Sequence, residues 1–196
     1  MFTNNYIAFR KAAFTAGYSY STTVWMKNAV GSSVEACVAH FAFADIGYWM
    51  TKALCATNAG IASSTTLTSQ NFSGLYFGTG STPATKADYK LESPITSGLT
   101  ITNPSALVWD NDGNGKYTAC ADFIVRNTTE SEINIYEIGV FVPTTPKGTA
   151  AVSSTQGTVN YVLMERTVLD EPITITPGES KLVTYKITFN QTLNVE

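Results

Sequence analysis

The sequence predicts an all-β protein with an antiparallel β-sandwich or jelly-roll-like core and an extended N-terminal region. From about residue 98 onward, apolar residues recur at every second position and not with the 3.6-residue period of a helix. Turn-forming residues interrupt this pattern about every ten residues, as in antiparallel sandwiches and barrels. We therefore expect an N-terminal arm or edge segment over residues 1–30 and a β-sandwich domain over 31–196, best defined over 98–190.

The N-terminal half gives weaker signals. Residues 5–15 mix alanines with aromatic residues that are poor helix formers, and we expect extended structure there. Two short strands, 22–28 and 34–38, flank Gly31 and Ser32 and predict a hairpin. The Ser/Thr-rich stretches 57–73 and 79–85 are expected to be loops, and 86–91 to hold one helical turn.

The C-terminal half predicts a series of strands joined by turns. A strand ends near Trp109, and the Asp/Asn/Gly-rich run 110–115 predicts a tight hairpin into the strand 116–127. Further strands are expected at 133–142, 159–169, 173–176 and 181–189, with a long loop over 143–158. The predicted core residues are Phe123, Val125, Ile135, Phe141, Leu163 and Tyr185, and fewer than about one fifth of the residues should be helical.

The composition limits the possible partners. The chain is 44% hydrophobic but only 14% charged, compared with about 25% charged in an average soluble domain, so we expect another molecule to cover part of its surface. A net charge of −3 gives no basic field for phosphates, so no direct nucleic-acid partner is expected. No apolar run has the length of a membrane span or of a signal-peptide core, and we expect a mature protein with no membrane partner.

The residues that usually carry catalysis or bind cofactors are sparse. His40 is the one histidine and lies among apolar neighbours, which favours a structural role. Cys37, Cys55 and Cys120 lack zinc-ligand spacing, which favours free thiols. Gly78-Thr79-Gly80 lacks the third glycine of a phosphate loop, and the run 110–115 favours a β-turn over a calcium loop. We therefore expect no enzyme, no catalytic residue, no cofactor and no metal.

Two charges lie among apolar neighbours on their strands. Glu137 shares a strand face with Ile135 and Phe141, and Arg166 shares one with Val162 and Met164. An unpaired buried charge is costly, so Glu137 and Arg166 are predicted to form a structural ion pair, either inside the sandwich or across a subunit contact. The alternative is that both faces meet solvent and the pair never forms.

Aromatic residues accumulate in the first part of the chain. A monomer would have to solvate them in a region with few charges, and large exposed apolar patches are rare on monomers. We therefore expect residues 1 to about 30 to pack on a neighbouring copy in a homo-oligomer of cyclic symmetry. The candidate oligomer contacts are Tyr6, Phe9, Phe14, Tyr18 and Trp25.

Four segments, taken together and in order, resemble those of a known group of proteins. They are GLYFGTGSTPATKADYKLESPI (74–95), NIYEIGVFV (134–142), VLMERTVL (162–169) and PITITPGESKLVTYKITF (172–189). They resemble uncharacterised structural proteins from the morphogenesis regions of tailed bacteriophages and prophages. The resemblance covers about the last 120 residues, implies a virion β-sandwich and carries over no active-site residue.

These observations predict a non-enzymatic virion subunit that is assembled in the cytoplasm of the bacterial host. Its expected partners are copies of itself and capsid, neck or collar, or tail proteins. The alternative is a host-surface carbohydrate-binding or adhesin module of a phage fibre, which would use exposed aromatics such as Trp25, Trp49 or Trp109. A β-sandwich hydrolase is disfavoured because Asp45, Asp88, Asp122 and Asp170 show no paired spacing.

Overall fold

The computed structural model describes residues 1–8, 22–28, 30–38, 74–102, 108–111, 116–144 and 160–190. Within these ranges it has nine strands, all in antiparallel pairs, and one helical segment at residues 4–8. The strands are β1 (Thr22–Lys27), β2 (Ser33–Val38), β3 (Gly74–Gly78), β4 (Leu99–Thr102), β5 (Val108–Asn111), β6 (Lys116–Asn127), β7 (Ile133–Thr144), β8 (Asn160–Ile175) and β9 (Ser180–Asn190). The all-β prediction is confirmed, whereas these strand orders do not establish a jelly roll.

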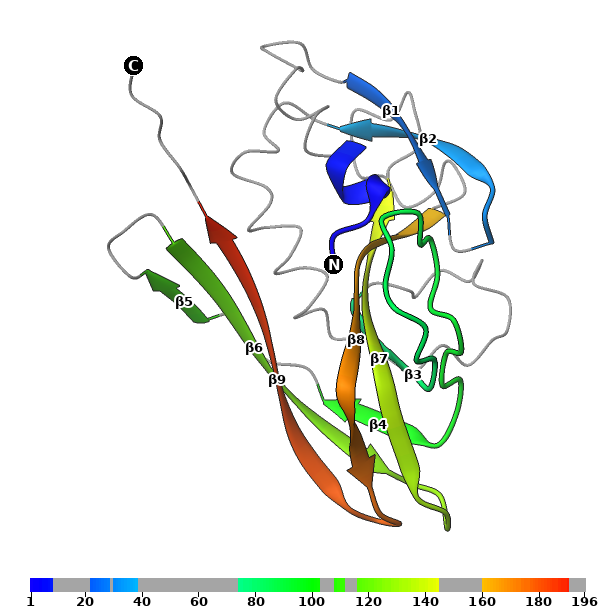
Figure 1. Ribbon diagram of the computed structural model, residues 1–196, viewed down its shortest axis with the longest axis vertical. Coiled ribbons are helices and arrows are strands. Elements are labelled where there is room, and N and C mark those ends of the chain that lie inside the picture. Colours follow the sequence, from blue (N-terminus) through cyan, green and yellow to red (C-terminus); the bar gives the residue numbers. More distant parts are fainter. Residues whose placement is uncertain are drawn as a thin grey trace.

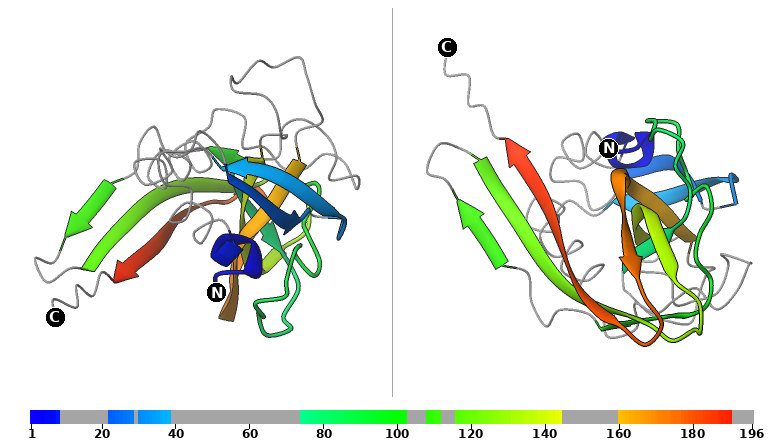
Figure 2. Two further views of the ribbon diagram at one scale, coloured as in Figure 1. Left: turned by 90° about the horizontal axis from the view of Figure 1, so that it is seen from above. Right: turned by 60° about the horizontal axis from the view of Figure 1, so that its bottom comes forward.

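The strands form three sheets. β1 and β2 make a hairpin; β3, β7 and β8 make a second sheet; and β6 is the centre of a third sheet, with β9 on one side and β4 and β5 on the other. The two larger sheets lie closest where the β6–β7 and β8–β9 turns cross between them, and they splay apart toward the other end (Figures 1 and 2). The predicted hairpins β1–β2 and β5–β6 are both confirmed.

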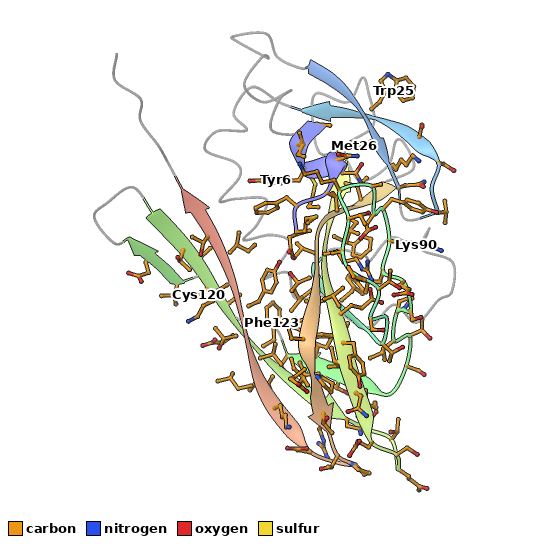
Figure 3. All side chains as sticks on the ribbon, viewed as in Figure 1. Tyr6, Trp25, Met26, Lys90, Cys120 and Phe123 are labelled. Atoms are coloured by element: carbon orange, nitrogen blue, oxygen red, sulfur yellow. The ribbon has the colours of Figure 1, made fainter. Side chains whose placement is uncertain are left out.

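The core between the two larger sheets follows from the alternation in β6 and β9. Phe123 and Val125 of β6 are fully buried, and Phe123 lies between the sheets (Figure 3). Their neighbours at even positions face outward, as the period of two predicts. All six predicted core residues are buried. Four of them, Phe123, Val125, Ile135 and Tyr185, belong to this cluster, which also contains residues of β3, β4 and β8.

The sheet of β3, β7 and β8 is buried on both faces. Every residue of β3 is buried, as are residues 137–141 of β7 and 162–166 of β8. On the face away from the core, Phe141 meets Tyr76 edge to face with ring centroids 5.4 Å apart, and Leu163 and Leu91 both approach Gly139. The segment 79–95 therefore forms a third layer over this sheet.

The N-terminal residues differ from the prediction. Residues 4–8 are helical and not extended, and the Ile7 amide donates to the Thr3 carbonyl at 3.1 Å. The reason is tertiary: the Asn5 side chain bonds both the amide and the carbonyl of Lys27, each at 2.8 Å, and its Nδ2 also donates to the Leu163 carbonyl. These contacts fix the segment against β1 and β8 and override the weak local propensity. The rest of the predicted extended stretch lies outside the described residues.

β8 also differs from the prediction, because it is one strand where the sequence predicted two. Between the pairs Glu137↔Val168 and Ile135↔Ile173, β8 advances five residues while β7 advances two. The turn-forming residues Asp170, Glu171 and Pro172 are thereby accommodated as a bulge in a continuous strand. Bulges of this kind let a proline lie in a strand without breaking the pairing on either side.

Two further differences concern the segment before β4. Gly74–Gly78 forms the buried edge strand β3, so the core extends beyond the predicted range 98–190. Residues 86–91 contain a turn at 86–87 but no helical turn, which corrects that prediction. Several predicted features lie outside the described residues: the loop 57–73, His40, the hairpin tip at 112–115 and most of the loop 143–158.

One buried asparagine joins the two turns at the closed end of the core. Asn127 is fully buried, and its Nδ2 donates to the carbonyls of Ser131 and Ile175 at 2.7 and 2.9 Å. Its Oδ1 accepts from the amide and the hydroxyl of Thr129, both at 2.8 Å. Its backbone carbonyl accepts from the amide of Gly178 in the β8–β9 turn. A polar side chain satisfied in this way fixes both turns relative to each other.

Candidate functional site

The most highly charged buried cluster that the structure describes is centred on Arg166. Glu137 of β7 and Arg166 of β8 lie on the same face of adjacent strands, and Arg166 Nε donates to Glu137 Oε2 at 2.8 Å. Both predicted partners of the ion pair thus meet inside one chain, where Glu137 is 0% and Arg166 3% exposed. At this depth each charge needs its partner.

Two other carboxylates in this cluster were not predicted from the sequence. Arg166 Nη1 donates to Asp88 Oδ2 at 2.9 Å, and Nη2 donates to Glu92 Oε2 at 3.4 Å. Asp88 and Glu92 belong to the segment 79–95, which crosses the outer face of the sheet. No local pattern signals this contact, because Asp88 and Arg166 are 78 positions apart.

Backbone amides complete the surroundings of Glu137. Ser93 and Glu92 donate to its two carboxylate oxygens at 2.7 and 3.0 Å, and Gly80 donates at 3.3 Å. A Cβ on Gly80 would lie 2.7 Å from Glu137 Oε1, and one on Gly78 would lie 2.7 Å from the Ser93 carbonyl oxygen. The Gly80 amide, together with those of Glu92 and Ser93, therefore binds an anion, and that anion is the protein's own carboxylate.

The surroundings of Asp88, Glu92 and Arg166 favour their charged forms. Burial by itself raises the pKa of Asp88, but hydrogen bonds from Thr85 and Arg166 outweigh burial, and the pKa is lowered. The pKa of Glu92 is lowered mainly by hydrogen bonds from Thr82. Burial opposes the charge of Arg166, yet Asp88 and Glu137 raise its pKa. The one guanidinium is shared by three carboxylates, and backbone amides and hydroxyls supply the other donors that these carboxylates need.

A second buried carboxylate lies on the core side of β8. Glu165 accepts from the Tyr185 hydroxyl, and its Oε1 accepts from Thr167 Oγ1 at 2.6 Å and from the Met1 amine at 2.6 Å. Burial, together with the charge of Glu165, raises the pKa of Tyr185 well above its usual value. Glu165 and Tyr185 connect the two larger sheets through a polar contact inside the core.

A cleft of about 340 Å³ opens between the helical segment 4–8, β1 and residues 87–89. Its lining combines two aromatic residues with polar and charged ones: Asn4, Asn5, Ala8, Trp25, Met26, Lys27, Ser33, Ala87, Asp88 and Tyr89. Lys27 Nζ lies 5.6 Å from the centre of the Tyr89 ring, within the range of a cation–π contact. The cleft therefore offers a ligand both an aromatic surface and exposed polar side chains.

The predicted oligomer contacts differ from one another in how exposed they are. Tyr6 is 6% exposed and stacks on Phe2 of its own chain, with ring centroids 4.0 Å apart, so the expectation that another chain covers it is wrong. Trp25 is 64% exposed and projects clear of the ribbon (Figure 3). Phe9, Phe14 and Tyr18 lie outside the described residues.

The described residues contain no group of three or more His, Cys, Asp or Glu side chains arranged to hold a metal ion. Cys120 of β6 is partly buried and free. No helix in the described ranges is long and apolar enough to cross a membrane.

The fold and these sites define an all-β protein with a buried ion cluster on one sheet and an aromatic, polar cleft beside it. Comparisons with models of known protein families, with curated proteins and with solved structures give no match.

Proposed function

We propose that this protein is a non-enzymatic structural subunit of a tailed bacteriophage virion, which associates with copies of itself and docks on capsid, neck or collar, or tail proteins. The low fraction of charged residues and the resemblance of the segments in residues 74–189 to phage morphogenesis proteins support this proposal. A surface with few charges is easily desolvated, which favours permanent contacts between subunits.

The observation that carries the proposal is a group of exposed aliphatic side chains on the outer face of the sheet around β6, which is the face that points away from the core. Val108, Ile124 and Leu182 are 67%, 48% and 67% exposed there, and Ile124 and Leu182 are direct cross-strand partners. Between them lie polar contacts such as Thr184 to Asp122, at 2.6 Å. Large aliphatic side chains on an otherwise polar face are typical of a surface that another protein covers.

The edge of the same sheet supports the proposal. β9 is 11 residues long and pairs only with β6 among the described strands. In contrast, N-terminal residues cover part of the β8 edge: the Thr3 amide donates to the Met164 carbonyl at 2.9 Å, and the Arg166 amide donates to the Met1 carbonyl. A long edge strand offers backbone donors and acceptors to a neighbouring chain.

The oligomeric mass tests the role of this face. We expect the protein to be oligomeric by light scattering and Leu182→Lys to lower that mass, because a lysine there would have to be desolvated in the contact. Val30→Lys, at a residue 53% exposed in the β1–β2 turn, is the matched control and should leave the mass unchanged. A protein that is monomeric at high concentration would contradict self-association.

Cryo-electron microscopy of particles from the encoding phage or prophage tests the virion assignment. The fold should fit density at the head, neck or tail, with the outer face around Leu182 against a neighbouring subunit. Purified particles in which mass spectrometry detects no copy of this chain would overturn the proposal.

A further inference from the structure

The cleft beside β1 has the size and shape of a small-molecule site. Its volume of about 340 Å³ lies at the lower end of the range of roughly 300–1,000 Å³ found for such sites. Three separate parts of the chain form it, namely the helical segment 4–8, the β1–β2 hairpin and the turn 87–89. The Asn5 hydrogen bonds to Lys27 hold the first two parts together, so the cleft is preformed.

The aromatic residues of this cleft suit a flat ligand with an apolar face. Trp25 and Lys27 alternate along β1, and Ser33 is the cross-strand partner of Lys27, so the three side chains share one face of the hairpin. Tyr89 approaches this face beside Gly31 and Lys27. The C–H face of a sugar ring stacks on an exposed indole or phenol ring in the way that other apolar groups do.

The polar residues and charges narrow the class of ligand. Asn4, Lys27 and Ser33 are exposed and can donate hydrogen bonds to ring hydroxyls. Asp88 is bonded to Arg166 at 2.9 Å, whereas Lys27 has no carboxylate partner among the described residues. Lys90 is a second cation beside the cleft, with Nζ 6.0 Å from the centre of the Tyr89 ring. Lys27 therefore offers an unpaired ammonium to a carboxylate of the ligand.

We propose that this cleft binds a saccharide that carries a carboxylate, such as a terminal uronic or sialic acid. The sugar ring stacks on Trp25, and Lys27 receives the carboxylate. This inference goes beyond the proposed structural role and does not depend on it. The cleft lies beside the β1–β2 hairpin, whereas the proposed subunit contact lies around Leu182 on the sheet of β6 and β9.

Binding measurements on the full chain test this proposal. The probes are oligosaccharides ending in glucuronic acid or sialic acid and their neutral counterparts, titrated by calorimetry and by saturation-transfer nuclear magnetic resonance. We expect saturable binding of acidic probes, with an affinity lowered about tenfold or more by Trp25→Ala. Lys27→Gln should abolish the preference for acidic over neutral probes.

A variant on the sheet around β6 serves as the control. Lys186→Gln removes an exposed lysine far along the sequence from the cleft residues, and it should not change saccharide binding. No saturable binding of any probe at millimolar concentration, or full affinity in both cleft variants, would overturn the proposal. A change in oligomeric mass without a change in binding would bear on the structural role alone.

Discussion

Among individual residues, Arg166 contributes most to the charged cluster because three carboxylates bond the same guanidinium. Nε, Nη1 and Nη2 each have a different partner, Glu137, Asp88 and Glu92 respectively. The planar guanidinium presents its donors in a fixed fork, so that Nε, Nη1 and Nη2 each point at a different acceptor. Lysine at this position would carry all its donors on one nitrogen and would lose this geometry.

A double-mutant cycle measures the interaction free energy between Glu137 and Arg166. Arg166→Met should lower the free energy of unfolding by about 3 kcal/mol or more, because it leaves the buried Glu137 carboxylate without a counter-charge. Glu137→Gln should cost less, because Asp88 and Glu92 still bond the Arg166 guanidinium. The double variant should cost clearly less than the sum of the singles. Chemical denaturation gives all three values. Small, additive losses would show that the two side chains do not interact in solution.

The matched control for this cycle is a pair at the surface. Lys181 Nζ lies 3.8 Å from Glu179 Oε1, and the two side chains are 39% and 34% exposed. Lys181→Met should therefore cost less than about 1 kcal/mol.

Asp88 makes the stability of the fold depend on pH. Its pKa is lowered in the folded state from the ordinary 3.8, so the ionised group contributes stability above that value, and this contribution is lost as pH falls through the folded-state pKa. Asp88→Asn should therefore be less stable near neutral pH and lose less stability on acidification. Denaturation midpoints from about pH 7 down to about pH 3 check this. Parallel pH profiles for both proteins would contradict the assignment.

Among the elements, the segment 79–95 depends on two glycines. It carries Asp88 and Glu92 to Arg166, and it brings three amides to Glu137. Gly78 and Gly80 allow this approach because a Cβ at either position would collide with the atoms that hold the segment in place. The glycines are needed for space, and neither has a positive φ.

Gly80→Ala tests that requirement. Its Cβ would lie 2.6 Å from the Glu92 Cβ and 2.7 Å from Glu137 Oε1, so we expect a loss of about 2 kcal/mol or more in the free energy of unfolding. Gly178 is the comparison, with a φ of 74° and no atom within 4 Å of the place that a Cβ would take, and Gly178→Asn should cost less than about 1 kcal/mol. Equal effects of the two changes would mean that the close approach at Gly80 relaxes freely.

For the molecule as a whole, the N-terminal residues cover part of the β8 edge of the sheet formed by β3, β7 and β8. Phe2 forms a bridge with Glu165, Thr3 Oγ1 donates to the Leu163 carbonyl at 2.7 Å, and Asn5 joins β8 to β1. The segment thus links the hairpin layer to the sheet of β3, β7 and β8. Its aromatic residues Phe2 and Tyr6 pack on each other beside this edge.

Deleting residues 1–6 should therefore lower the thermal stability of each chain and not only its association. The deletion uncovers the β8 edge and removes the bonds to Leu163 and Met164, so Tm should fall by several degrees, by about 2–4 °C for each kcal/mol lost in a chain of this size. Calorimetry measures Tm, and light scattering measures the mass. An unchanged Tm with a reduced mass would show that the segment acts between chains, as the sequence pattern predicts.

The sequence by itself determined the elements whose signal is local. The period of two in residues 116–127 placed Phe123 and Val125 in the core, and the Gly/Asn-containing turns placed the β1–β2 and β5–β6 hairpins. The apolar neighbours of Glu137 and Arg166 predicted their pairing, but strand alternation did not give all the faces correctly. A bulge between Ile135 and Glu137 puts Ile135 in the core, whereas Glu137 and Phe141 lie on the opposite face of the sheet.

Only the tertiary structure decided the features that join distant segments. The helical turn at residues 4–8 exists because Asn5 bonds Lys27 and Leu163, and β8 runs through Pro172 because β7 pairs with it on both sides of the bulge. Asp88 reaches Arg166 only because the segment 79–95 folds across the sheet. The physical reason is the same in each case: contacts between residues far apart in the sequence leave no periodicity in it, and their energy exceeds the small local propensities that a sequence pattern reports.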